Sequence, residues 1–181
     1  MIRLLALVLT VLSAGCAARP TSAWQPGQAE AAAWWIEDVA HGLPRDPAEL
    51  DLVAAGPGAG RVAQWASGSR FGERWVPPRR LDSRLMRWPT LRSALVEQQV
   101  VPDGQGGLAI APGAPPARRT ALSALVEAEL ADRVFLDGLV LVLGAPDPEV
   151  ERVFHAAARS ARRMHDLSPA AGMPPAAPTG H

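Results

Sequence analysis

The chain has 181 residues, enough for one domain or two small ones, and its composition excludes several classes of protein. Eighteen basic side chains balance 18 acidic ones, so no net charge points to a nucleic acid. The single cysteine excludes an internal disulfide and a thiolate metal site. No His, Asp or Glu spacing suits a metal, and no nucleophile elbow or phosphate loop occurs. We therefore predict no catalytic residues, metal or cofactor, and an unrecognised hydrolase is the less favoured alternative.

The N-terminus is typical of a secreted bacterial protein. Residues 1–15 combine Arg3 with a short apolar run and small residues, as a signal peptide does. The run is too short to span a bilayer, and Cys16 follows it directly. This arrangement resembles a lipobox, although Ser13 stands where lipoboxes usually carry Leu. We expect acyl chains on Cys16 to anchor the protein to a membrane on its periplasmic face, with the outer membrane favoured over the inner. The alternative is an ordinary signal with a stray cysteine.

Residues 16–27 are expected to form a lipidated tether, and residues 28–80 a helical segment of unknown role. Its first helix should start at Gln28 and end before Gly42, a residue type common at helix C-termini. A second helix should start at Asp46, with Pro47 in its first turn and Glu49 completing a capping box. The run GPGAG at 56–60 is expected to end that helix, and 61–80 carry no clear pattern.

Residues 81–167 are expected to form a helical domain, and 168–181 a disordered tail rich in Pro and Ala. Helix is predicted on both sides of Pro89, with a break or kink at Trp88. Residues 99–116 are rich in turns, and their Leu-Ala-Ile run suits a short strand of a hairpin. The overall prediction is a mostly α fold with this short hairpin as a connection.

The strongest helical pattern covers residues 117–144. Its apolar stripe recurs every four residues, at Leu122, Val126, Leu130 and Val134, and Glu129 pairs with Arg133 on another face. Beyond Arg133 apolar residues surround most of the helix, so we expect this end to be buried. A strand at LVLVL is the alternative. A last helix should start at Asp147, which caps it ahead of Pro148.

Short motifs occur in one order through residues 84–163. Glu129, Ala131, Asp132 and Arg133 form E-x-A-D-R on the long helix. Before it come Arg87, Pro89, Leu91, Val100, Gly106 and Leu108, and after it Gly144, Pro148, Glu149, Val150 and Arg152. In order and spacing this set resembles the YdbL-like family of small periplasmic proteins. The turn departs from the family pattern at Gln98, Val101, Pro102 and Gly107, and Leu130 replaces an asparagine of the helix motif.

The resemblance implies a helical periplasmic accessory without catalytic residues. Members of the family are linked to an AsmA-like bridge that carries phospholipid between the inner and outer membranes. The expected function is therefore that of a lipid-anchored, chaperone-like interaction protein whose partner is an AsmA-like envelope protein. The alternative is a structural lipoprotein that binds the cell wall or an outer-membrane complex without a role in lipid transport.

Two groups of residues on the predicted helices are candidates for partner binding. Asp132 and Arg133, with Glu129, would contact a partner from the long helix, or form a solvated ion pair of little energetic weight. Trp34 would anchor a membrane or partner, or would lie half-covered beside a buried Trp35.

A third candidate is the arginine-rich stretch 70–92, which holds seven arginines. Arg79, Arg80 and Arg87 would meet anionic lipid headgroups, at about 1 kcal/mol each near a charged surface. An ordinary charged surface is the alternative.

Overall fold

A computed structural model of the chain describes residues 24–53, 57–71, 74–144 and 147–168. This part is mostly helical, which confirms the predicted fold class. Its helices are α2 (Pro26–Ala40), α3 (Ala48–Val53), α4 (Pro57–Ala66), α5 (Arg79–Val96), α6 (Arg119–Gly144) and α7 (Pro148–Leu167), and a 3-10 turn (Pro116–Arg118) leads into α6. The strands form two antiparallel hairpins, β1 (Ser69–Phe71) with β2 (Arg74–Val76), and β3 (Val100–Pro102) with β4 (Leu108–Ile110).

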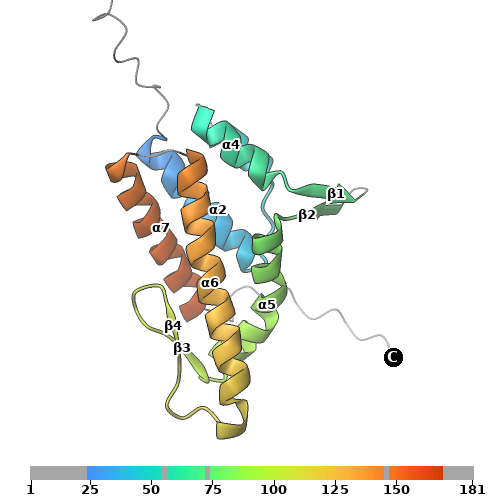
Figure 1. Ribbon diagram of the computed structural model, residues 1–181, viewed down its shortest axis with the longest axis vertical. Coiled ribbons are helices and arrows are strands. Elements are labelled where there is room, and N and C mark those ends of the chain that lie inside the picture. Colours follow the sequence, from blue (N-terminus) through green and yellow to red (C-terminus); the bar gives the residue numbers. More distant parts are fainter. Residues whose placement is uncertain (1–23, 54–56, 72–73, 145–146, 169–181) are drawn as a thin grey trace, which may run out of the picture.

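Helices α2, α4, α5, α6 and α7 build the body of the described part. Helix α2 packs along α7, while α6 contacts α4 and α5. Helix α6 follows the long axis, with the β3–β4 hairpin near its first half and the β1–β2 hairpin projecting beyond α5 (Figure 1). The segment before residue 81 therefore shares its packing with the segment after it.

The predicted capping residues start the helices as expected. Asp147 Oδ1 accepts hydrogen bonds from the backbone N–H groups of Glu149 and Val150, at 2.9 Å each. Asp46 Oδ1 accepts the backbone N–H of Ala48 at 2.8 Å, ahead of α3. Gly42 has φ +78°, a conformation that favours glycine and lets the chain turn away after α2.

The structure departs in part from three sequence-based expectations. The second helix, α3, ends at Val53, ahead of the GPGAG run, but the run itself begins a new helix, α4, at Pro57, a residue type favoured in a first helical turn. Helix is present on both sides of Pro89, as expected, but α5 continues through this residue without a break. Pro89 is exposed, and the lost backbone hydrogen bond is offset by buried side chains such as Leu81 and Leu91 on either side. The end of α6 is helical rather than a strand, but it is only partly buried, since Val142 is 75% exposed.

Two hydrophobic clusters fill the interior. The larger one joins α2, α4, the start of α5 and the facing halves of α6 and α7, with Ile36, Leu81 and Phe154 among its members. The smaller one joins the second half of α5, the β3–β4 hairpin and the first half of α6. On α5 and α6 the residues between the two clusters are charged, and these residues define the first candidate site.

Candidate functional site

A layer of buried charged side chains crosses the molecule between the two hydrophobic clusters. We call it the charge layer. Each of the four long helices contributes to it: Glu37 from α2, Arg84 and Arg87 from α5, Glu129, Asp132, Arg133 and Asp137 from α6, and Arg162 and Asp166 from α7. All except Arg87 are at most 8% exposed. Burial of so many charges is stable only where each one is paired.

Glu37 and Arg84 form the centre of the charge layer. The Arg84 guanidinium donates to both carboxylate oxygens of Glu37, at 2.6 and 3.0 Å, and its Nε donates to Glu129 at 2.8 Å. Arg162 Nε donates to Glu37 at 2.9 Å and its Nη2 to Asp137 at 2.5 Å. A two-pronged guanidinium–carboxylate pair fixes both the distance and the orientation of its partners. The centre therefore sets how α2, α5, α6 and α7 sit against each other.

The acids and bases of α6 extend the layer to both sides. Arg133 donates to Glu129 at 2.9 Å and to Asp166 of α7 at 3.1 and 3.2 Å. It also donates to the backbone oxygen of Gly106 at 3.0 Å, which ties the turn between β3 and β4 to α6. Asp132 accepts from Arg87 at 2.5 Å and from Arg80 at 2.6 Å.

The ion pairs shift the pKa values of the buried groups toward their charged forms. Burial by itself raises the pKa of Glu129, but the nearby Arg84 and Arg133 outweigh it and lower that pKa to about 2. Burial likewise opposes the charge on Glu37, yet Arg84 and Arg162 hold its pKa well below the usual value. Burial lowers the pKa of Arg84, and Glu37 and Glu129 more than reverse that shift. These carboxylates are therefore ionised at neutral pH and are poor proton acceptors.

Two stacked imidazoles border the layer where α2 ends. The rings of His41 and His165 lie 4.5 Å apart, and the edge of Trp88 meets His41 at 4.4 Å. His165 Nε2 is 2.8 Å from Asp38, and His41 Nε2 is 3.5 Å from Asp166. The pair joins the C-terminal ends of α2 and α7.

In chemical terms the charge layer is a structural device. Its carboxylates are occupied by guanidinium groups, which leaves none poised as a base beside a nucleophile. Within the described ranges no group of three His, Cys, Asp or Glu side chains has a geometry that would hold a metal ion. The layer fixes helix register, because a shift of one helix would leave buried charges without partners.

The structure corrects our expectation for Glu129, Asp132 and Arg133. These residues are only 2–3% exposed, so they neither contact solvent nor present a face to a partner. The Glu129–Arg133 pair predicted from their spacing is present. Arg87 is turned inward as well, and so is Arg84, so the arginine-rich stretch 70–92 is not one continuous surface patch.

The remaining candidates lie at the surface. Arg79 and Arg80 are exposed at the start of α5, and Arg80 reaches Asp132. Trp35 is 3% exposed and belongs to the core, whereas Trp34 is partly buried and packs against the larger cluster. This is the arrangement expected if Trp34 lies half-covered beside a buried Trp35. Cys16 and the tail lie outside the described residues, so the lipidation prediction stays a prediction.

Sequence reasoning missed Glu37, Arg84, Arg162 and Asp166. A signal was present, because Arg84 falls on the same helical face as Leu81 and Leu91, and Asp137 lies three residues before the buried Val140. Charged residues within an apolar stripe indicate either a helix boundary or a buried pair. Only the arrangement of the helices shows which charges meet.

The outward side of α6 is apolar and uncovered, and we call it the outer face of α6. It is made of residues spaced by three or four positions: Ala131, Val134, Phe135, Gly138 and Val142. Val134 is 74% exposed, Phe135 46% and Val142 75%. The acids of this half of the helix, Asp132 and Asp137, point into the molecule, so the outer face carries no charge of its own.

Two arginines border the outer face. The guanidinium carbon of Arg80 lies 4.9 Å from the centre of the Phe135 ring, a cation–π contact. Near the other end, Arg61 of α4 donates from Nε to the backbone oxygen of Leu143 at 3.0 Å. Large exposed apolar groups along one stripe mark interaction sites on soluble domains.

Comparison with known proteins identifies no relative of the chain. No protein-family model matches the chain, and no curated protein or solved structure is significantly similar to it. In the part of the chain that the structure describes, none of the helices combines the length and apolar character needed to cross a bilayer.

Proposed function

We propose that this protein is a lipid-anchored, chaperone-like accessory of the bacterial envelope, and that it docks a partner protein on the outer face of α6. The carrying observation is the exposure of Val134, Phe135 and Val142 on a rigid helix. Three such side chains cost free energy in water, since burying each one is worth about 1.5–3 kcal/mol. The charge layer beneath them holds α6 in place, so the docking surface is preformed.

The chemistry of the outer face specifies the occupant. An apolar stripe on a helix fits an amphipathic segment laid along it, with its own apolar residues at helical spacing. Arg61 at one border fits a carboxylate on the edge of that segment, and Arg80 at the other border is bound to Asp132 but keeps a 53% exposed side chain that can meet a second carboxylate. A second copy of the chain fits less well, because two outer faces would bring arginines together without an acid on the face to oppose them.

The proposed acyl anchor at Cys16 keeps the docking surface next to a membrane. Acyl chains contribute about 0.8 kcal/mol per buried methylene, which keeps a soluble helical unit at a membrane. The partner proposed from the YdbL-like resemblance is an AsmA-like envelope protein of a phospholipid-transport assembly, and the outer membrane is the proposed location.

The test is site-specific photocrosslinking in native envelopes with the full-length chain. A photoreactive residue replaces Val134 or Val142, and the matched control carries it at Met164, which is 50% exposed on α7. A Cys16→Ala copy is analysed in parallel, with mass spectrometry of the bait for acyl chains. We expect an AsmA-like protein to be crosslinked from Val134 and Val142 but not from Met164, and acyl chains on the parent chain only.

Other products would contradict the proposal in different ways. Recovery of cell-wall fragments or abundant porins alone would favour the structural-lipoprotein alternative. Crosslinks from both α6 positions to lipid alone would mean that the face lies on a membrane, and crosslinks to a second copy would mean self-association. If Val134→Asp left the AsmA-like crosslink from position 142 unchanged, the outer face of α6 would not be the surface that binds the partner.

A further inference from the structure

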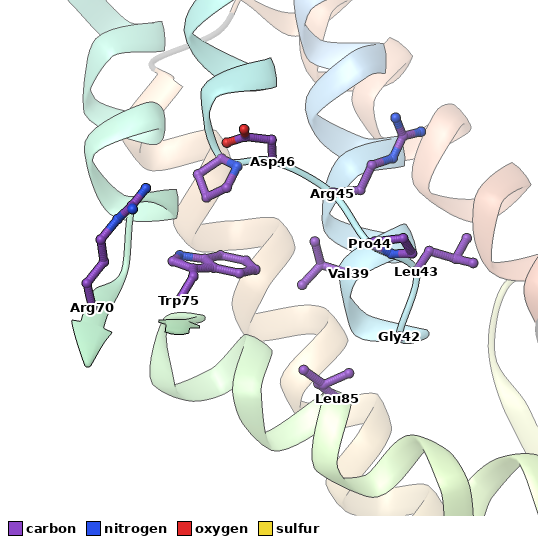
Figure 2. Close-up of a pocket in the computed structure, with 10 residues that line it drawn as sticks. Val39, Gly42, Leu43, Pro44, Arg45, Asp46, Arg70, Trp75 and Leu85 are labelled. Carbon is purple, nitrogen blue, oxygen red and sulfur yellow. The ribbon is translucent and has the colours of Figure 1, made fainter. Parts of the chain in front are cut away.

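A separate concavity lies beside the C-terminal end of α2. It is an open pocket with a volume of about 530 Å³, bordered by the loop that follows α2, the β1–β2 hairpin and α5 (Figure 2). Its apolar lining comes from the last turn of α2 and from these three segments, and consists of Val39, Leu43, Pro44, Pro47, Trp75 and Leu85. A volume of this size lies in the range of small-molecule sites, which is about 300–1,000 Å³.

The walls of this pocket are held in place by the surrounding structure. Trp75 donates its indole N–H to the backbone oxygen of Ser67 at 3.0 Å, and its ring meets Trp35 edge-on at 5.9 Å. The hydrogen-bonding group of Trp75 is thereby satisfied, and Figure 2 shows its ring extending into the space between Arg70 and Val39. The loop that forms the opposite wall begins at the positive-φ turn of Gly42. The pocket is therefore preformed rather than a gap between mobile side chains.

The charges around the pocket are not equally available. Arg45 is engaged by Asp38 at 2.6 Å and by Glu49 at 2.9 Å. The Asp46 carboxylate accepts the backbone N–H of Ala48 and so caps α3. Arg70 is exposed on the rim, and within the described residues no carboxylate pairs with it. The pocket thus combines an apolar interior with one guanidinium that has no acid of the described chain to neutralise it.

We propose that this pocket binds a small anionic amphiphile, an acyl chain that ends in a carboxylate or a phosphate. The acyl chain would lie on Trp75, Val39 and Leu85, and the acidic head would meet Arg70. Apolar walls remove the chain from water, while a guanidinium binds both head groups through two parallel hydrogen bonds. The pocket is too small for a folded element of a partner. This proposal depends on the pocket geometry alone and not on the docking of a protein at α6.

The test uses the full-length chain in phosphatidylcholine nanodiscs and photoreactive probes. One probe is dodecanoic acid with a diazirine and an alkyne, a second is the lysophosphatidate with the same acyl chain, and the third is the uncharged monoacylglycerol. Labelled peptides are located by tandem mass spectrometry. We expect one or both acidic probes to label peptides that contain Trp75 or Leu85, and the stronger of the two identifies the head group. The monoacylglycerol should label these peptides about tenfold less, because it lacks the charge-assisted contact.

Two arginine variants isolate the proposed contact. Arg70→Gln removes the rim charge, and Arg163→Gln removes another exposed arginine, on α7, that does not line the pocket. We expect about tenfold less pocket labelling in Arg70→Gln and no change in Arg163→Gln, with circular dichroism unchanged in both. Equal labelling in the two variants, or equal labelling by acidic and uncharged probes, would overturn the proposal. Label spread over the surface or confined to the outer face of α6 would overturn it as well.

Discussion

The substitution Glu37→Gln tests whether the charge layer holds the helices together. Glu37 is 1% exposed and accepts hydrogen bonds from Arg84 and Arg162, so it neutralises parts of two buried guanidiniums. Glutamine keeps the volume but loses the charge, and its amide N–H₂ has to face a donor. Arg84 would then retain Glu129, and Arg162 would retain Asp137.

The expected loss in the free energy of unfolding follows from the buried guanidinium charge that Glu37 no longer neutralises. Removing one partner of a buried pair costs about 3–5 kcal/mol, since the other charge stays buried without full compensation. A whole domain is stable by only about 5–15 kcal/mol, so this single change should remove a large share of the free energy of unfolding. We would measure it by urea unfolding at pH 7, followed by tryptophan fluorescence and circular dichroism.

A matched variant separates burial from charge. Glu49→Gln breaks an ion pair with Arg45 whose two side chains are 40–44% exposed, and this should cost less than about 1 kcal/mol. If Glu37→Gln lowered the free energy of unfolding by no more than Glu49→Gln, at an unchanged m-value, the charge layer would not be a determinant of stability. A double substitution in which Glu37 and Arg84 both become Met should recover part of the loss, because no charge of that pair is then left buried.

Further predictions concern pH and two glycines. The folded-state pKa of Glu129 is lowered from 4.5 to about 2, and that of Asp166 is lowered below 3.8. The stability that these two carboxylates contribute is therefore complete above their ordinary pKa values and is lost as pH falls toward 2. An acid titration of the free energy of unfolding will show this loss. A melting curve unchanged between pH 5 and pH 2.5 would contradict this. Gly138→Ala should raise the unfolding free energy by about 0.5–1 kcal/mol, because Gly138 lies inside α6 with nothing within 4 Å of an added Cβ. Gly144→Ala should lower it, since its Cβ would lie 2.8 Å from Cε2 of the buried Trp24. Melting temperatures of both variants equal to that of the parent chain would refute both expectations.

Much of the fold could be predicted from the sequence, because local interactions determine it. Asp147 and Asp46 cap helices through bonds to residues two or three positions away, and the i,i+4 spacing of Glu129 and Arg133 is itself enough to form their pair. Such contacts depend on neighbours in the chain and survive any arrangement of the helices. The mostly α class, the hairpin near residues 99–116 and the start of α7 follow from them.

The tertiary structure alone decided which way each helix faces. Glu37 meets Arg84 and Arg162 across long separations in sequence, and no local rule states that these three charges share one buried site. The same arrangement turned Asp132 and Arg133 inward and left Val134 and Val142 in solvent, against the sequence-based expectation for both. The physical reason is that α6 carries both apolar and charged residues around most of its circumference. Its neighbours can bury only one side, and the arginines of α5 and α7 make the charged side the one that is buried.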